Sequence, residues 1–201
     1  MNIFFSDNDK NMYVRCLAKQ AVRYELTILS YCLMPNHIHL IVVPKERDSL
    51  ALAIGEAHRR YTYRINQRNN IRGYLFQGRF YSCALNEKHA VAAIRYVERN
   101  PVRAGIVTNA WDYPWSSASY HVGLREIDPL VTTRNYFGLI SNWKDLLNIE
   151  PDEIKILRSR IKTGRPCGDN EFVRKAELIT GRILMRQKPG PKLDVDRKGG
   201  E

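Results

Sequence analysis

The sequence lacks any apolar run close to the roughly 20 residues that a membrane-spanning helix needs. Its first residues, MNIFFSDNDKNMY, do not place a basic stretch before an apolar one, as a secretory signal peptide would. The four cysteines form no CxxC pair and no short disulfide-like spacing, so free thiols in a reducing compartment are the simplest interpretation. We therefore expect a cytoplasmic globular protein with no membrane partner.

Acidic residues are also missing from one long stretch, Ala57 to Asn86, where arginines alternate with aromatic side chains. The whole chain carries a net charge of +11. Guanidinium groups pair with phosphates, and aromatic faces stack on unpaired bases, so this stretch predicts a nucleic-acid partner. The alternative is a solvated basic surface without a specific target. The residues predicted to contact DNA are Arg59, Arg60, Tyr63, Arg64, Arg68, Arg72 and Arg79, together with Arg103 further along the chain.

The apolar patterns predict an α+β fold with an antiparallel sheet. The expected elements are a helix over 8–24, strands over 24–34 and 37–44, a helix over 50–70, a short strand over 79–85 and a helix over 87–100. A Pro-Asn turn joins the first two strands. Short helices are expected between 152 and 187, before a tail rich in Pro, Gly and charge that we expect to be disordered.

The stretch HIHLIVVP places His37 and His39 two residues apart on a strand, so both side chains point to the same face. Two imidazoles held in this way form half of a metal site, or a pair of hydrogen-bond donors for a phosphate. Two unrelated histidines at a strand end are the alternative.

In the predicted helix IRYVERN, Tyr96 and Asn100 are four residues apart and so share a helical face. The Asn100 carbonyl oxygen is a suitable hard ligand for Mg²⁺ or Mn²⁺, and the Tyr96 phenol is a possible nucleophile. A helix packed across the histidine strand would bring these groups to one metal. The alternatives are a structural tyrosine and a polar residue at a helix end before proline.

Taken in order, YCLMPNHIHLIVVP, FQGRFYSCAL, RYVERNPVRAGIV and WDYPWSS resemble the REP-associated tyrosine transposases, a branch of the single-tyrosine HUH transposases that is described as IS200-like. The resemblance runs from about Ile3 to Tyr120. It implies a ferredoxin-like or RRM-like antiparallel sheet with helices on one face, followed by a helical C-terminal extension. The domains implied are a transposase domain over 1–125, the extension over 126–187 and a basic tail over 188–201.

The resemblance assigns roles to the residues singled out above. His37 and His39 match the histidine pair, Tyr96 matches the nucleophile, and Asn100 matches the polar metal ligand one helical turn later. Such enzymes nick single-stranded DNA beside a hairpin through a 5′-phosphotyrosine bond, with Mg²⁺ or Mn²⁺. The covalent bond conserves the energy of the broken phosphodiester, so rejoining needs no ATP, and the sequence has no GxxxxGK[ST] loop. The expected partner is single-stranded or hairpin DNA in the bacterial nucleoid, bound by a monomer or a homodimer.

Family members usually carry a further strand before the segment equivalent to NIFFSDND, so we expect the sheet to lack that strand. The runner-up hypothesis is accordingly a hairpin-binding relative that no longer cuts. A third hypothesis, RNA binding on an RRM-like sheet, is disfavoured because the aromatic RRM signature is absent.

Overall fold

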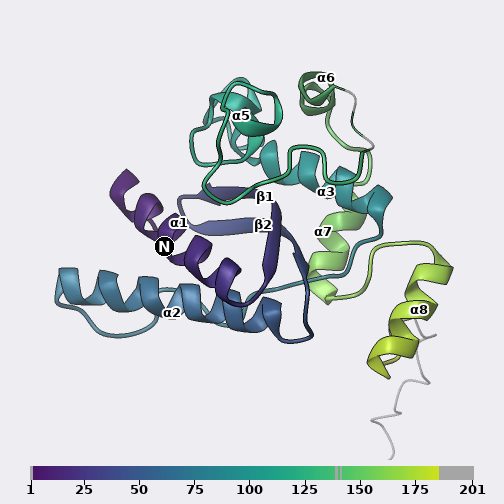
Figure 1. Cartoon of the computed structure of the whole chain (residues 1–201), viewed down its shortest axis with the longest axis horizontal. Coiled ribbons are helices and arrows are strands. Elements are labelled where there is room, and N and C mark those ends of the chain that lie inside the picture. Colours follow the sequence, from purple (N-terminus) through teal and green to yellow (C-terminus); the bar gives the residue numbers. More distant parts are fainter. Residues whose placement is uncertain (1, 139, 141, 186–201) are drawn as a thin grey trace, which may run out of the picture.

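A computed structural model describes residues 2–138, 140 and 142–185 of the chain. Within these residues a two-stranded sheet lies between helices, which confirms the predicted α+β class (Figure 1). The predicted tail, 188–201, lies outside the described residues. In chain order the elements are α1 (Asp7–Arg23), β1 (Leu26–Met34), β2 (His37–Pro44), α2 (Ser49–Asn69), α3 (Glu87–Glu98), α4 (Asn100–Arg103), the 3-10 helix η1 (Ala110–Asp112), α5 (Ala118–His121), α6 (Trp143–Asn148), α7 (Ile154–Thr163) and α8 (Asn170–Thr180).

Helix α1 begins one residue before its predicted start, because Ser6 caps it. The backbone N–H of Asp9 donates to the Ser6 hydroxyl, and the backbone N–H of Ser6 donates to the Asp9 carboxylate. This reciprocal pair satisfies donors that the first turn of a helix leaves free. The buried face of α1 places Tyr13 and Leu17, both 0% exposed, against α2 and the sheet.

Strands β1 and β2 pair antiparallel through a Pro-Asn turn, as predicted. The register shifts at Leu29, which forms a β-bulge in β1. As a result, consecutive side chains reach the same helix: Leu29 packs with Ile94 of α3, and the Ser30 hydroxyl donates to Glu98 of α3. The bulge therefore lets β1 offer both an apolar and a polar contact to α3.

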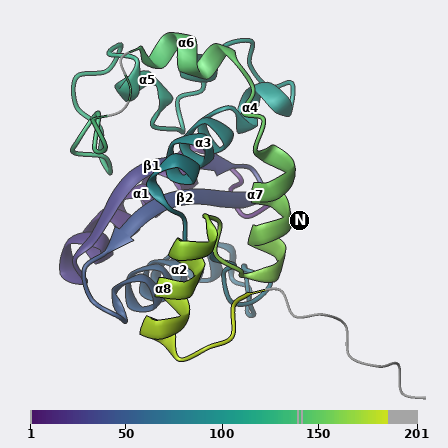
Figure 2. The same cartoon turned by 90° about the vertical axis from the view of Figure 1, so that its right-hand side faces the viewer.

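Helices cover both faces of the sheet. On one face, α1 and α2 enclose an aromatic core that includes Phe4, Tyr13 and Tyr61 (Figures 1 and 2). On the other face, α3 packs Tyr96 against Cys32 of β1. The structure differs here from the expectation that the helices share one face. The reason is visible in LTILSYCLM: all but one residue of β1 are buried, so both faces of the strand must be covered.

The outer edge of β1 is covered by a segment that follows much later in the chain. The backbone N–H of Leu33 donates to the Trp115 carbonyl at 2.9 Å, and the N–H of Ser117 donates to the Tyr31 carbonyl at 3.1 Å. An uncovered edge presents unpaired backbone groups to other chains. The segment Trp115–Ser117 therefore pairs with the edge of β1 as a third strand would, but over only a few residues.

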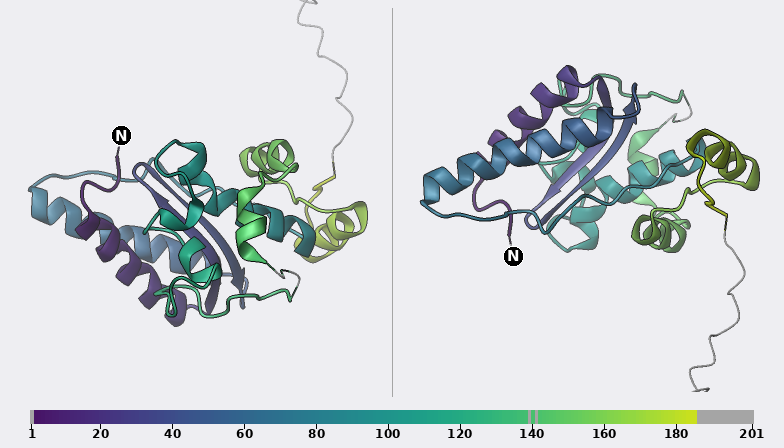
Figure 3. Two further views of the ribbon diagram at one scale, coloured as in Figure 1. Left: turned by 90° about the horizontal axis from the view of Figure 1, so that it is seen from above. Right: turned by 90° about the horizontal axis from the view of Figure 1, so that it is seen from below.

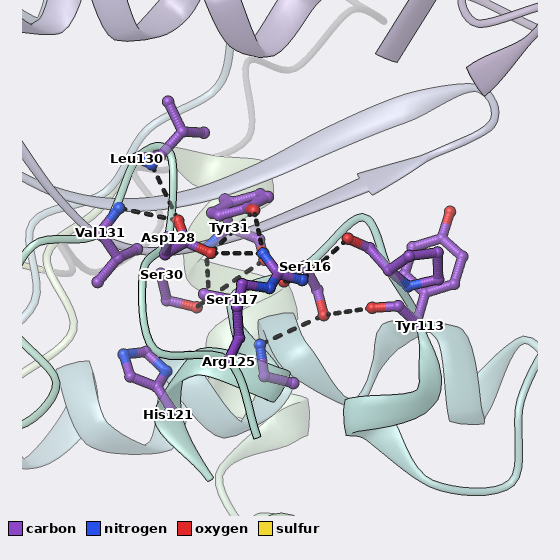
Figure 4. Close-up of polar contacts among 12 residues, drawn as sticks. Ser30, Tyr31, Tyr113, Ser116, Ser117, His121, Arg125, Asp128, Leu130 and Val131 are labelled. Carbon is purple, nitrogen blue, oxygen red and sulfur yellow. Dashed lines mark hydrogen bonds and ion pairs between the residues drawn. The ribbon is translucent and has the colours of Figure 1, made fainter. Parts of the chain in front are cut away.

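A buried carboxylate holds this covering segment in place. Asp128 accepts hydrogen bonds from the Tyr31 hydroxyl at 3.1 Å and from Arg125 at 2.8 Å, and its other oxygen accepts from the backbone N–H groups of Leu130 and Val131 (Figure 4). Each of the two carboxylate oxygens thus accepts two hydrogen bonds. Because the partners come from β1 and from the later segment, Asp128 joins the two.

Helices α7 and α8 agree with the short helices predicted between 152 and 187, and α6 precedes them. Helix α7 packs on α3 through Leu157, which is 1% exposed. After α7 the chain is tied down at Cys167, whose N–H donates to the Ala84 carbonyl and whose carbonyl accepts from the N–H of Asn86. Across the described part of the chain no helix has the length and apolarity that a bilayer span requires.

The strand predicted over 79–85 is wrong. Only Leu85 pairs, in an isolated bridge with Cys167. Arg79, Phe80 and Tyr81 are all exposed, so the segment buries no continuous face that could hold it against a neighbouring strand. It forms instead a long connection that runs from the α2 layer to the α3 layer (Figure 3).

Candidate active site

His37 and His39 lie together at the start of β2. Their Nε2 atoms are 3.1 Å apart, and their rings meet edge to face with centroids 4.8 Å apart. The Nδ1 of His37 lies 2.7 Å from the Oδ1 of Asn36. Since an amide oxygen can only accept, this contact puts the proton of a neutral His37 on Nδ1, so its Nε2 is an acceptor that faces the Nε2 of His39.

The pocket keeps both imidazoles neutral. Burial lowers the pKa of His39 to about 3, with smaller contributions from the neighbouring His37 and Arg103. Burial also lowers the pKa of His37. At pH 7 both rings therefore retain a nitrogen lone pair that can accept a proton or bind a cation.

Tyr96 reaches the same place from α3. Its ring lies edge to face with that of His39, with centroids 5.7 Å apart, and the residue is 8% exposed. The guanidinium carbon of Arg103, in α4, lies 4.2 Å from the Tyr96 ring centroid. The structure thus brings the predicted nucleophile, the histidine pair and one predicted DNA-contacting arginine together.

Asn100 lies next to this group, but its side chain is already engaged. Its Nδ2 donates to the carbonyls of Tyr96 and Val97, and its Oδ1 accepts from Arg103 at 2.5 Å. The local cause is that α3 ends at Glu98, so Asn100 opens α4 and its amide satisfies the last carbonyls of α3. Among the described residues no group of three or more His, Cys, Asp or Glu could hold a metal ion. The site therefore offers two nitrogen donors, without a third ligand already in position.

The predicted DNA-contacting residues of α2 lie on the other side of the sheet from Tyr96, and several are paired. Arg59 and Arg60 both bind Glu56, and Arg68 binds the buried Asp9 at 2.5 Å. These contacts neutralise part of the basic surface. Sequence reasoning missed them because both acids lie outside the acid-free stretch.

The remaining predicted residues are exposed. Arg64, Arg72 and Arg79 make no ion pair among the described residues, and Tyr63 is 58% exposed. The loop that carries two of these arginines is held by Leu75, which is 5% exposed. Two aromatic side chains of this loop project outward: Tyr74 is 96% exposed and Tyr81 is 79% exposed.

A buried polar network behind Tyr96 was not predicted. One oxygen of Glu98 accepts hydrogen bonds from Ser30, Ser117 and Nδ1 of His121, and Glu98 is 0% exposed. The His121 ring in turn stacks on Trp143 at 4.1 Å. The network joins α3, β1 and the covering segment, and its members are too far apart in sequence for spacing to reveal it.

Residues 2–100 match the sequence model of the family described as "Transposase IS200 like". This is the segment that contains β1, β2, the histidine pair and Tyr96. This segment therefore belongs to the IS200-like transposase family, which confirms the resemblance found in its motifs.

Two individual proteins that resemble this chain are both named as REP-associated tyrosine transposases. A protein of Haemophilus influenzae, whose name places it among the REP-associated tyrosine transposases, is 26% identical over an alignment of 105 residues that covers 47% of this chain and 60% of that protein. The chain thus spans about three fifths of the length of this relative. A solved structure of a REP-associated tyrosine transposase bound to a REP hairpin matches with a TM-score of 0.51 and 21% identity, over 63% of this chain and 74% of that one. The match to this solved structure supports the fold of the chain.

Proposed function

We propose that this protein nicks and rejoins single-stranded DNA beside hairpins, with Tyr96 as the nucleophile. The observation that carries the proposal is the contact between Tyr96 and His39, whose Nε2 lies 3.1 Å from that of His37. Family membership supports it, as does the REP hairpin to which the structural neighbour is bound. A tyrosine beside two neutral imidazoles is suited to phosphoryl transfer.

The proposed reaction is an exchange of one phosphate ester for another, so it needs no oxidant, reductant or nucleotide. The Tyr96 oxygen forms a bond to phosphorus as the bond from phosphorus to the 3′ oxygen breaks. The phenol proton leaves to water, and the departing 3′ oxygen takes up one proton. The product is a 5′-phosphotyrosine and a free 3′-OH. Attack by a 3′-OH on the phosphotyrosine reverses the step and rejoins the strand.

His37 and His39 are the residues that would hold Mg²⁺ or Mn²⁺, because both are neutral and their Nε2 atoms converge. When bound, such a cation polarises the scissile phosphate. Asn100 would become a better third ligand if its oxygen left Arg103, since the guanidinium now occupies one of its two lone pairs and would repel a cation. The two imidazoles carry no negative charge, so modest metal affinity is expected.

The basic surface is proposed to hold the DNA flanking the cut. Arg64, Arg72 and Arg79 are exposed without an acidic partner among the described residues. Such arginines pair with phosphates, and exposed rings such as Tyr63 and Tyr74 stack on unpaired bases. We propose monomeric or dimeric action in the bacterial nucleoid, where hairpin repeats are available.

The test is a covalent-adduct assay. Single-stranded oligonucleotides that contain the inverted repeats next to the gene are labelled at the 3′ end and incubated with the protein and Mg²⁺ or Mn²⁺. A 5′-phosphotyrosine keeps the 3′ label on the protein, whereas a 5′ label is released. Tyr96→Phe is expected to abolish the adduct, and Tyr136→Phe, at an exposed tyrosine, is expected to keep it.

A second function, hairpin binding without cutting, is favoured by one observation: the oxygen of Asn100 is held by Arg103 rather than free for a metal. Hairpin binding with no adduct under either metal would support this alternative. An adduct that survives Tyr96→Phe would instead contradict the assignment of the nucleophile.

A further inference from the structure

Helix α7 brings a second arginine to Tyr96. The guanidinium carbon of Arg158 lies 5.9 Å from the Tyr96 ring centroid, and that of Arg103 lies 4.2 Å from it. Arg158 belongs to the C-terminal extension, beyond the segment 2–100 that matches the family. Two cationic side chains from different parts of the chain therefore meet at one phenol.

The position of Arg158 is fixed by its neighbours. The adjacent Leu157 is 1% exposed and belongs to the same buried cluster as Tyr96. Beyond α7, Cys167 is hydrogen-bonded to Ala84 and Asn86, immediately before α3. The helix is thus held at Leu157 and again a few residues after its end, so packing places the backbone of Arg158.

Both guanidinium groups have hydrogen-bonding capacity left. Arg158 is exposed and makes no hydrogen bond or ion pair among the described residues. One terminal nitrogen of Arg103 is buried without a hydrogen-bond partner, and its nearest carboxylate, Glu150, is 3.6 Å away and half exposed. Two guanidinium groups with unused donors beside one phenol are suited to an anion with several oxygens.

We propose that Arg158 and Arg103 together bind the scissile phosphodiester at Tyr96, so that the C-terminal extension completes the active site. The proposal rests on the proposed function. Arg158 contacts a non-bridging phosphate oxygen, and Arg103 contacts another, while the Tyr96 oxygen forms the bond to phosphorus and the 3′ oxygen leaves. Charge that develops on the phosphate in the transition state is stabilised by donors that are already in place.

The first arm of the test measures the rate of adduct formation under single-turnover conditions, with the 3′-labelled hairpin oligonucleotide. Arg158→Ala is expected to slow the reaction by about 10²-fold, the effect typical of losing one preorganised donor. Arg158→Lys should recover part of the rate, since lysine keeps the charge but not the planar fork. Arg174→Ala, which removes the same charge from the exposed surface of α8, should leave the rate unchanged.

The second arm does not depend on cutting. In a Tyr96→Phe background, binding of the same oligonucleotide is measured over a range of salt concentrations. Loss of the Arg158 contact should reduce the slope of log K against log salt by about 0.7, as expected for one phosphate contact on a single strand. Circular dichroism and the melting temperature establish that Arg158→Ala remains folded.

The outcomes separate the two proposals. An adduct in the wild type with an unchanged rate and salt slope in Arg158→Ala overturns the role of Arg158 alone. A faster rate in Arg158→Ala overturns it as well, because α7 would then obstruct Tyr96. No adduct in the wild type, with the salt slope still dependent on Arg158, overturns the cutting reaction and keeps the phosphate site.

Discussion

The two faces of the β1–β2 sheet differ in the chemistry that they bury. The face toward α1 and α2 encloses Tyr13, Tyr61 and Leu17 in an aromatic and aliphatic core. The face toward α3 buries Tyr96 and, nearby, the carboxylate of Glu98, and it half-buries His39. One face therefore supplies stability, while the other positions polar groups. The difference teaches that a strand buried on both sides can position a cluster of polar side chains without exposing its core.

The largest effect is expected at the histidine pair. His39→Ala removes one of the converging Nε2 atoms, and we expect adduct formation to fall by about 10³-fold, within the range for loss of a group that acts in proton transfer or metal binding. The melting temperature should change little. His89→Ala, in the first turn of α3, is the control. A rate within a few-fold of the wild type would show that the α3 face is structural rather than reactive.

On the opposite face the expected effect is on stability. Leu17 is 0% exposed, so Leu17→Ala should lower the free energy of unfolding by about 3 kcal/mol in a urea titration. The adduct rate of the folded fraction should stay the same. Val22→Ala, at a position that is 83% exposed, should have almost no effect on either quantity. A Leu17→Ala variant with the stability of the wild type but slower adduct formation would contradict the view that this face of the sheet supplies stability alone.

Glu98 tests whether the polar groups behind Tyr96 also support the fold. Glu98→Gln keeps an acceptor oxygen but loses the charge that three donors share, and it introduces an amide N–H where no partner lies. We expect a loss of about 2 kcal/mol in the free energy of unfolding. Glu87→Gln, at an exposed residue of the same helix, is the matched control. Equal melting temperatures for the two variants would contradict this view.

The smallest expected effect on stability lies at the ion pair between Asp9 of α1 and Arg68 of α2. Burial raises the pKa of Asp9, but hydrogen bonds from Arg68 and from the backbone N–H of Phe5 outweigh burial, so the pKa is lowered overall. The pair therefore stabilises the fold above the unfolded-state pKa of about 4, and this contribution is lost as pH falls through the lower folded-state value. Arg68→Ala should cost about 1 kcal/mol at pH 7, because the arginine is half exposed.

A pH series checks the sign of that effect. The difference between Arg68→Ala and the wild type should shrink as the pH is lowered below about 4, because protonated Asp9 no longer attracts the guanidinium. Arg64→Ala, an exposed arginine of α2 without an acidic partner among the described residues, serves as the control. A difference that grows at low pH would contradict the assigned pairing.

The elements that local rules control could be predicted from the sequence. The Ser6 cap of α1, the Pro-Asn turn and the same-side placement of His37 and His39 all follow from spacing within a few residues. The helices of the extension were predicted for the same reason. The strand over 79–85 was wrong, because exposure outweighed its β propensity.

What could not be predicted depends on contacts between distant parts of the chain. Nothing in the spacing of Glu98, Ser117 and His121 indicates that they share one network. The approach of Arg158 to Tyr96 depends on how α7 packs against α3. The pairing of Arg68 with Asp9 likewise appears only when α1 and α2 lie side by side.

The covered edge of β1 has a consequence for how the chain is made. The backbone N–H of Tyr31 donates a hydrogen bond to Ser117, 86 residues later in the chain. Strand β1 therefore leaves the ribosome long before the segment around Ser117 that covers its edge. At about 5–20 residues per second, that segment follows roughly 4 to 17 seconds later. During this interval the nascent chain carries an open, apolar strand that can pair with another copy. The protein should therefore be most prone to aggregate during synthesis, and its yield should depend on translation rate and on chaperones that bind extended segments.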